Sequence, residues 1–82
     1  MTIDRGELYR RVGEILDREG IVGVSRVIYY DFALSLLRAL AKTPMEDRGK
    51  TTEALITRYR YEHMAKKTVL RKIAKALTRR RS

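Results

Sequence analysis

The stretch Thr43-Pro44-Met45-Glu46 divides the chain into helices that precede it and helices that follow it. Threonine is a favoured N-cap residue, and proline is favoured at the first helical position, where its missing amide hydrogen costs nothing. Glu46 then stands where a capping-box glutamate is expected. Because the residue before a proline is pushed out of the helical region, an upstream helix must end here. We therefore predict one helix that ends near residue 42 and another that begins at residue 44.

Two helices are predicted upstream of this stretch. Asp4 and Glu7 fit a capping box, apolar residues recur at helical spacing over residues 8–16, and Gly20 suits the position after a last turn, which together predict a helix over residues 5–19. Ser25 is a suitable N-cap for a second helix over residues 25–42.

The second of these helices carries apolar residues over much more than one stripe, a pattern typical of a helix buried on several sides. In a chain this small, we expect copies of the same chain to cover part of it. The residues expected at this oligomer interface are Val27, Ile28, Tyr30, Leu34, Leu37 and Leu40.

Downstream, neither glycine nor proline follows Gly49. Residues 44–80 are therefore compatible with one long helix, about 56 Å at 1.5 Å per residue. The apolar pattern changes phase between Tyr59 and Val69, and Thr68 is suited to cap a new helix, so the second interpretation is two helices over 44–64 and 68–80. Either interpretation predicts an all-α fold of three to four helices in a single domain over residues 1–82.

The charge of the 82-residue chain is distributed unevenly. It has 19 Lys+Arg and 10 Asp+Glu, which gives a formal net charge of +9. Residues 1–41 hold six basic and six acidic side chains, so residues 42–82 carry the whole excess. This asymmetry predicts a neutral self-association half, residues 1–42, and a basic nucleic-acid-binding half, residues 43–82.

The basic half contains an amphipathic segment near the C-terminus. On a helical wheel Val69, Leu70, Ile73 and Leu77 gather on one side and a row of lysines and arginines on the other, which is the electrostatic pattern of a nucleic-acid binder. Upstream, Arg58-Tyr59-Arg60-Tyr61 alternates cations with rings that can contact phosphates or stack on bases. The candidate nucleic-acid-binding residues are Arg58, Arg60, Lys66, Lys67, Arg71, Lys72, Lys75, Arg79, Arg80 and Arg81.

These features predict a non-catalytic, largely sequence-independent double-stranded DNA-binding and packaging protein that acts in many copies. A nucleoid protein of the cytoplasm or an archaeal viral nucleocapsid subunit inside a virion would fit. A small RNA-binding or ribosome-associated protein is the alternative, since composition does not separate DNA from RNA. The lack of Asn, Gln and Cys beside abundant Arg, Lys and Glu suggests a thermophilic source.

Residues 24–63 resemble the ribbon–helix–helix family of transcription regulators. In that resemblance residues 24–30 are the strand, residues 31–42 the first helix, and Gly49-Lys50-Thr51-Thr52-Glu53-Ala54-Leu55-Ile56 the start of the second. It implies a dimer that places strand residues such as Arg26 and Ile28 in the major groove of DNA. The alternative fold is thus a ribbon–helix–helix core with extra N- and C-terminal helices.

Several function classes are disfavoured by what the chain lacks. It has no cysteine and a single histidine, His63, and its carboxylates are spaced as helix caps and ion-pair partners. We therefore expect no enzyme, no metal, no cofactor and no small-molecule substrate. No run of 18 apolar residues is present, the chain does not open with a signal-peptide pattern, and the C-terminal stripe lacks Trp and Phe, so we expect no membrane partner.

Overall fold

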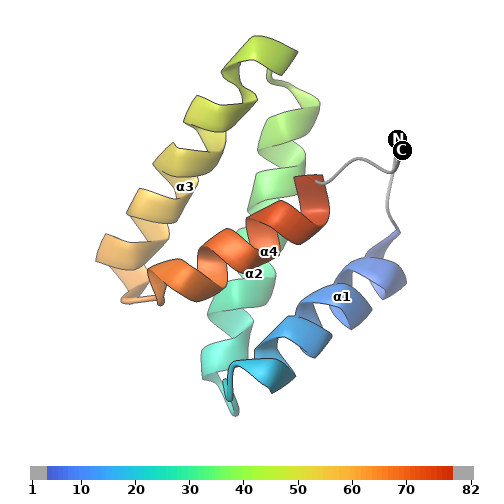
Figure 1. Ribbon diagram of the computed structural model, residues 1–82, viewed down its shortest axis with the longest axis vertical. Helices are drawn as coiled ribbons and strands as arrows, with labels where there is room; N and C mark the ends of the chain where they lie inside the picture. The colour runs from blue at the N-terminus through green and yellow to red at the C-terminus, as the bar shows by residue number, and fades with distance from the viewer. Residues whose placement is uncertain (1–3, 79–82) are drawn as a thin grey trace.

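The computed structural model describes residues 4–78, which form four α-helices without a strand (Figure 1). The elements are α1 (Arg5–Arg18), α2 (Ser25–Ala41), the 3₁₀ turn η1 (Met45–Asp47), α3 (Arg48–His63) and α4 (Lys67–Thr78). The all-α prediction is confirmed, and the two-helix interpretation of residues 44–80 is the correct one. The final residues of the helix expected over 68–80 lie outside the described range.

The ribbon–helix–helix alternative is wrong. Val24 has helical dihedral angles (φ −65°, ψ −19°), and Ser25 opens α2, so Arg26 and Ile28 lie on a helix. The physical reason is the spacing of the buried side chains. Tyr29, Phe32 and Leu36 recur every three or four residues and face one core, whereas a strand would direct alternate residues to opposite sides.

The N-terminus of α1 and the loop after it follow the sequence closely. The Asp4 carboxylate accepts a hydrogen bond from the Glu7 amide at 2.8 Å, as a cap should. The Glu7 carboxylate pairs instead with Arg11, at 2.7 Å, so the reciprocal half of the capping box is replaced by an ion pair. Gly20 has φ +73°, the left-handed conformation that glycine tolerates best, and it ends the helix as predicted.

The stretch around Pro44 stops one helix as predicted but does not cap the next. α2 ends at Ala41, and the Thr43 hydroxyl donates a hydrogen bond back to the Ala39 carbonyl at 2.6 Å. The chain then makes the 3₁₀ turn η1 before α3 begins at Arg48, four residues later than expected. Ser25 is likewise the first residue of α2 rather than its cap. In both places side-chain chemistry marks the boundary correctly but assigns the capping role to the wrong residue.

A sharp turn over residues 64–66 separates α3 from α4. Met64 adopts the left-handed conformation (φ 57°, ψ 30°), and the Ala65 amide donates to the Tyr59 carbonyl at 3.2 Å, as in a Schellman motif. The Lys66 amide donates to the Tyr29 hydroxyl at 2.9 Å, which ties the turn to α2. Methionine thus occupies a position that usually belongs to glycine.

All four helices contribute to one hydrophobic core, and α4 packs against each of the other three (Figure 1). The most completely buried side chains include Leu16, Phe32, Leu36, Leu70 and Ile73. The Cα radius of gyration is 12.1 Å, close to the roughly 12 Å expected of a compact domain of this length. In the part of the chain that the structure describes, no helix is both long and apolar enough to cross a membrane.

Candidate nucleic-acid interface

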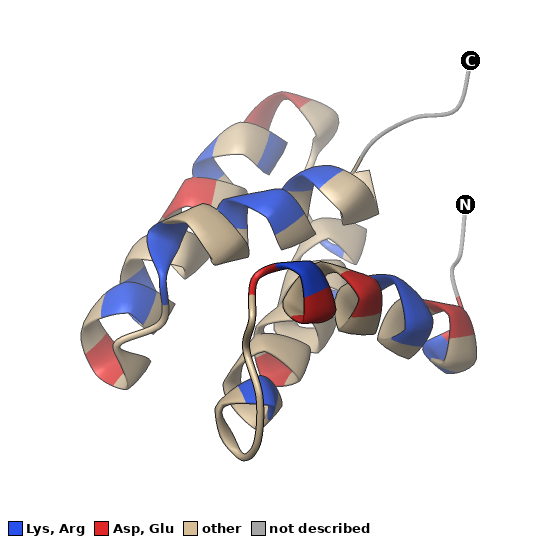
Figure 2. Ribbon diagram, turned by 60° about the horizontal axis from the view of Figure 1, so that its bottom comes forward, with Lys and Arg blue, Asp and Glu red and all other residues tan. Residues whose placement is uncertain are grey.

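α4 is anchored to the body of the protein along its apolar side and displays its basic side to solvent. Val69, Leu70 and Ile73 are at most 1% exposed, because they insert into the core formed with α1, α2 and α3. Lys67, Lys72 and Lys75 are exposed on the other side. Figure 2 shows these basic positions along α4, which carries no acidic residue. We call the side chains of Lys66, Lys67, Arg71, Lys72 and Lys75 the α4 basic ridge.

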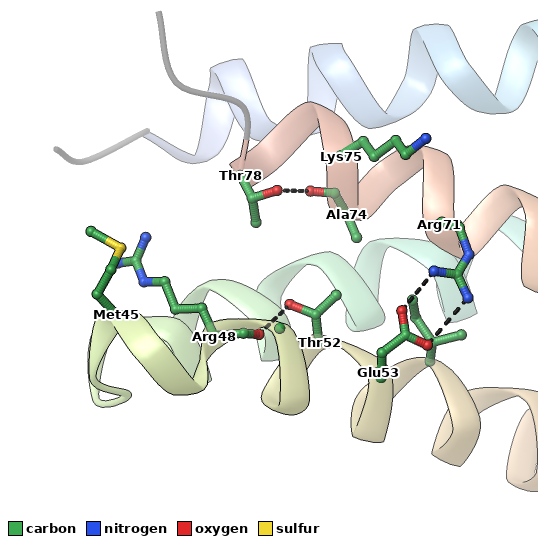
Figure 3. Close-up of a pocket in the computed structure, with 10 residues that line it drawn as sticks. Met45, Arg48, Thr52, Glu53, Arg71, Ala74, Lys75 and Thr78 are labelled. Carbon is green, nitrogen blue, oxygen red and sulfur yellow. Dashed lines mark hydrogen bonds and ion pairs between the residues drawn. The ribbon is translucent and has the colours of Figure 1, made fainter.

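Two members of the α4 basic ridge are engaged by acids from other helices. Arg71 donates a hydrogen bond from each terminal guanidinium nitrogen to the Glu53 carboxylate, at 2.6 and 3.2 Å (Figure 3). Hydrogen bonding from Arg71, and secondarily its charge and that of Lys67, lowers the pKa of Glu53 below its ordinary value. Two of the five N–H donors of Arg71, one on each terminal nitrogen, are therefore used by a neighbour within the fold, and the Glu53 carboxylate matches the charge of the guanidinium.

Lys72 is also paired with an acid but is more exposed than Arg71, 57% against 39%. Its ammonium group lies 2.5 Å from a carboxylate oxygen of Glu19, the residue that follows α1. An ammonium group has three donor hydrogens, so two remain available to other acceptors. The Lys72 side chain is also 57% exposed, and a phosphate can approach it without displacing Glu19.

The remaining members of the α4 basic ridge are open. Lys66, Lys67 and Lys75 are exposed, and within residues 4–78 none of them forms an ion pair. Lys67, Arg71 and Lys75 recur every four residues, which places them about 6 Å apart along the helix axis. The exposed lysines thus flank the occupied Arg71 on one line.

A shallow groove of about 390 Å³ lies between the first turns of α3 and the C-terminal part of α4 (Figure 3). Three cations line it: Arg48, Arg71 and Lys75. The Nε atom of Arg48 is buried and has no hydrogen-bond partner among the atoms described, and the Arg48 side chain runs toward Met45. The two hydroxyls of the groove, those of Thr52 and Thr78, donate to carbonyls of their own helices. Arg48 was not a candidate from the sequence, since only tertiary packing brings it opposite α4.

The Arg58-Tyr59-Arg60-Tyr61 stretch of α3 is split between the core and the surface. Tyr59 is 5% exposed and donates a hydrogen bond to Asp31 at 2.6 Å, so it packs inside the fold. Burial first, and then the bond to Asp31, raise the pKa of Tyr59. Arg58 pairs with Glu62 at 3.2 Å, while Arg60 lies over the ring of Tyr61, which is 76% exposed.

The residues expected at an oligomer interface fall into two groups. Leu40 is buried in the core of the single chain, and four others, Ile28, Tyr30, Leu34 and Leu37, are half-buried against that core. Only Val27, at 65% exposed, presents most of its side chain to solvent. α1, α3 and α4 of the same chain cover α2, so its apolar character does not by itself require a second copy.

His63 is exposed, with its ring centroid 5.0 Å from that of Tyr59. Arg79, Arg80 and Arg81 lie outside the described residues. From Asp4 to Thr78 the chain holds no cluster of three or more His, Asp or Glu side chains that could bind a metal ion.

No protein-family model, curated protein or solved structure matches this chain. Its function must therefore be inferred from the physical properties of its own surface.

Proposed function

We propose that the protein is a non-catalytic nucleic-acid-binding protein that grips the phosphate backbone of double-stranded DNA through the α4 basic ridge. One observation carries the proposal. α4 is fixed by its buried apolar side, and its outer side carries the exposed cations Lys67, Lys72 and Lys75 and no acidic residue of the helix itself. Because the core holds the backbone of α4 in place, binding to a polyanion costs little conformational entropy apart from that of the lysine side chains.

The dimensions of α4 support the proposal. A helix of 12 residues is about 18 Å long, and duplex DNA carries one charge per roughly 1.7 Å of axis. About ten phosphates therefore lie within the length of α4, more than enough for its cations. Because contacts to phosphate carry no sequence information, the affinity should fall steeply with salt concentration and vary little with DNA sequence.

Action in many copies, as in a nucleoid or a viral nucleocapsid, belongs to the same proposal. The exposed valines Val22, Val24 and Val27, at the end of the molecule where α1 passes into α2, support it as a surface for neighbouring copies. RNA as the polyanion is the second candidate, because phosphate chemistry is common to both.

The test is a salt titration of DNA affinity with two double variants. Lys67→Gln with Lys75→Gln removes two open cations of the ridge. Lys42→Gln with Lys50→Gln removes two exposed lysines elsewhere and makes the same change in net charge. At about 0.9 per phosphate contact, the ridge variant should flatten the slope of log K against log salt by about 1.8.

The control variant should leave that slope close to the wild-type value. Equal slopes for the two variants would show that no localised ridge exists and would overturn the assignment. Running the same titration on duplex RNA separates the two polyanions.

A further inference from the structure

A second surface adjoins the α4 basic ridge at the turn between α3 and α4. Tyr61 is 76% exposed, and Met64, three residues later, is 88% exposed. Single exposed apolar side chains are common on proteins, but Tyr61 in the last turn of α3 and Met64 at its C-cap lie in a segment rich in cations. We call Tyr61 and Met64 the apolar corner.

The backbone at this corner is held in an uncommon conformation. Met64 has φ 57°, a region that costs a residue with a Cβ atom more than glycine. The turn is fixed on both sides, because the Ala65 amide bonds to Tyr59 and the Lys66 amide bonds to Tyr29. Met64 is thus presented on a rigid turn, and its side chain makes almost no use of the core.

The surroundings of the apolar corner are positively charged. Arg60 lies over the Tyr61 ring at 5.7 Å, and Lys66 and Lys67 follow Met64 in the chain. The one acid of the turn region, Glu62, is engaged by Arg58 at 3.2 Å. The charge therefore favours an anionic partner, and the corner is continuous with the ridge through Lys66 and Lys67.

We propose that the apolar corner contacts unstacked nucleobases, so that the protein binds DNA with exposed bases more tightly than intact duplex. This inference rests on the proposed function, since the ridge supplies the phosphate contacts beside the corner. An intact duplex hides the faces of its bases within the stack. A tyrosine ring and a methionine side chain gain contact only where bases are unpaired or a base step is opened.

The experiment compares two labelled DNAs by fluorescence anisotropy: an intact duplex, and the same duplex with a short run of unpaired thymines in one strand. Stacking of one base on an aromatic ring corresponds to a preference of roughly fivefold or more for the second DNA. Tyr61→Ala should remove most of this preference while the affinity for intact duplex and the salt slope stay unchanged.

Met64→Gly is the matched second variant, because glycine suits φ 57° and the substitution cannot fail by straining the turn. It should preserve or raise thermal stability and reduce the preference further when combined with Tyr61→Ala.

The outcomes separate the two proposals. Salt-dependent duplex binding without a preference for unpaired bases, or with a preference that both variants retain, overturns this inference alone. Absence of salt-dependent binding to either DNA overturns the proposed function itself. Binding to phosphatidylserine–phosphatidylcholine vesicles that the two variants weaken, with DNA binding unaffected, would assign the corner to a membrane surface and also overturn the inference.

Discussion

Removing the carboxylate of Glu53 should increase the affinity of this protein for DNA. In the structure Glu53 occupies both terminal nitrogens of Arg71, in the middle of the α4 basic ridge. A phosphate that approaches Arg71 competes with Glu53 for the two terminal nitrogens and is repelled by the carboxylate. The variant Glu53→Gln removes the competing charge but keeps a side chain of the same size.

The expected magnitude follows from the number of contacts released. One guanidinium fork made available to one phosphate steepens the slope of log K against log salt by about 0.9. Between 200 and 50 mM salt this amounts to an additional gain in affinity of about 3.5-fold. Glu19→Gln should give a smaller effect, because Lys72 makes a single bond to its acid and its side chain, 57% exposed against 39% for Arg71, is already more accessible to phosphate in the wild type.

The control is Glu14→Gln, which breaks an exposed ion pair with Arg10 on α1 and changes the net charge equally. A titration in which Glu53→Gln behaves like Glu14→Gln would refute the placement of Arg71 at the interface.

The dependence on pH gives a second check on the same pair. Arg71 lowers the pKa of Glu53 from its ordinary value of 4.5, so the pair stabilises the fold at pH values above 4.5. That contribution is lost as the pH falls through the lowered pKa. The stability of Glu53→Gln should therefore fall less than that of the wild type as the pH drops through this range. At neutral pH Glu53 is fully ionised and competes with phosphate for Arg71.

Three further predictions concern the body of the protein. Leu36→Ala, at a site with no exposed surface, should lower the free energy of unfolding by about 2–5 kcal/mol in a denaturant titration, and Leu37→Ala, at a half-buried site, by less. Asp4→Ala should cost about 1 kcal/mol in the same assay and reduce helical circular dichroism, because the first turn of α1 loses its cap. Val27→Lys should reduce the mass of any oligomer in sedimentation while leaving the melting temperature nearly unchanged, and an unaltered mass would exclude Val27 from a contact between copies.

The sequence predicts most helix ends because residues at the ends themselves determine them. Gly20 and the Thr43-Pro44 pair mark two helix ends through backbone restrictions that do not depend on the rest of the fold. The turn after α3 is different, because no glycine marks it. A change in apolar phase and Thr68 indicate the break, although Thr68 lies inside α4 and is not its cap, and the left-handed conformation of Met64 becomes visible only in three dimensions.

The basic residues of the candidate interface could be predicted from the sequence, but which of them form ion pairs could not. The ion pairs of Arg71 with Glu53 and of Lys72 with Glu19 join residues 18 and 53 positions apart, so they depend on how α4 packs across α1 and α3. The same packing brings Arg48 opposite α4, whereas the packing of α3 on α2 buries Tyr59 instead of exposing it. Helical periodicity identifies the exposed side of α4, but which of its cations are free is a property of the tertiary structure.

The closed core of the single chain affects how strongly copies of the protein associate. A chain that buries the main apolar side chains of α2 internally leaves only a small apolar surface for association, that of Val22, Val24 and Val27. A formal net charge of +9 also makes identical copies repel one another. Around neutral pH and physiological salt this repulsion is screened only beyond about 8 Å, so it acts at the contact distances of packed subunits. If the proposed function holds, a polyanion that neutralises the α4 basic ridge weakens the repulsion and concentrates copies along its length. Self-association and DNA binding would then be thermodynamically linked, each increasing the affinity of the other by the same factor.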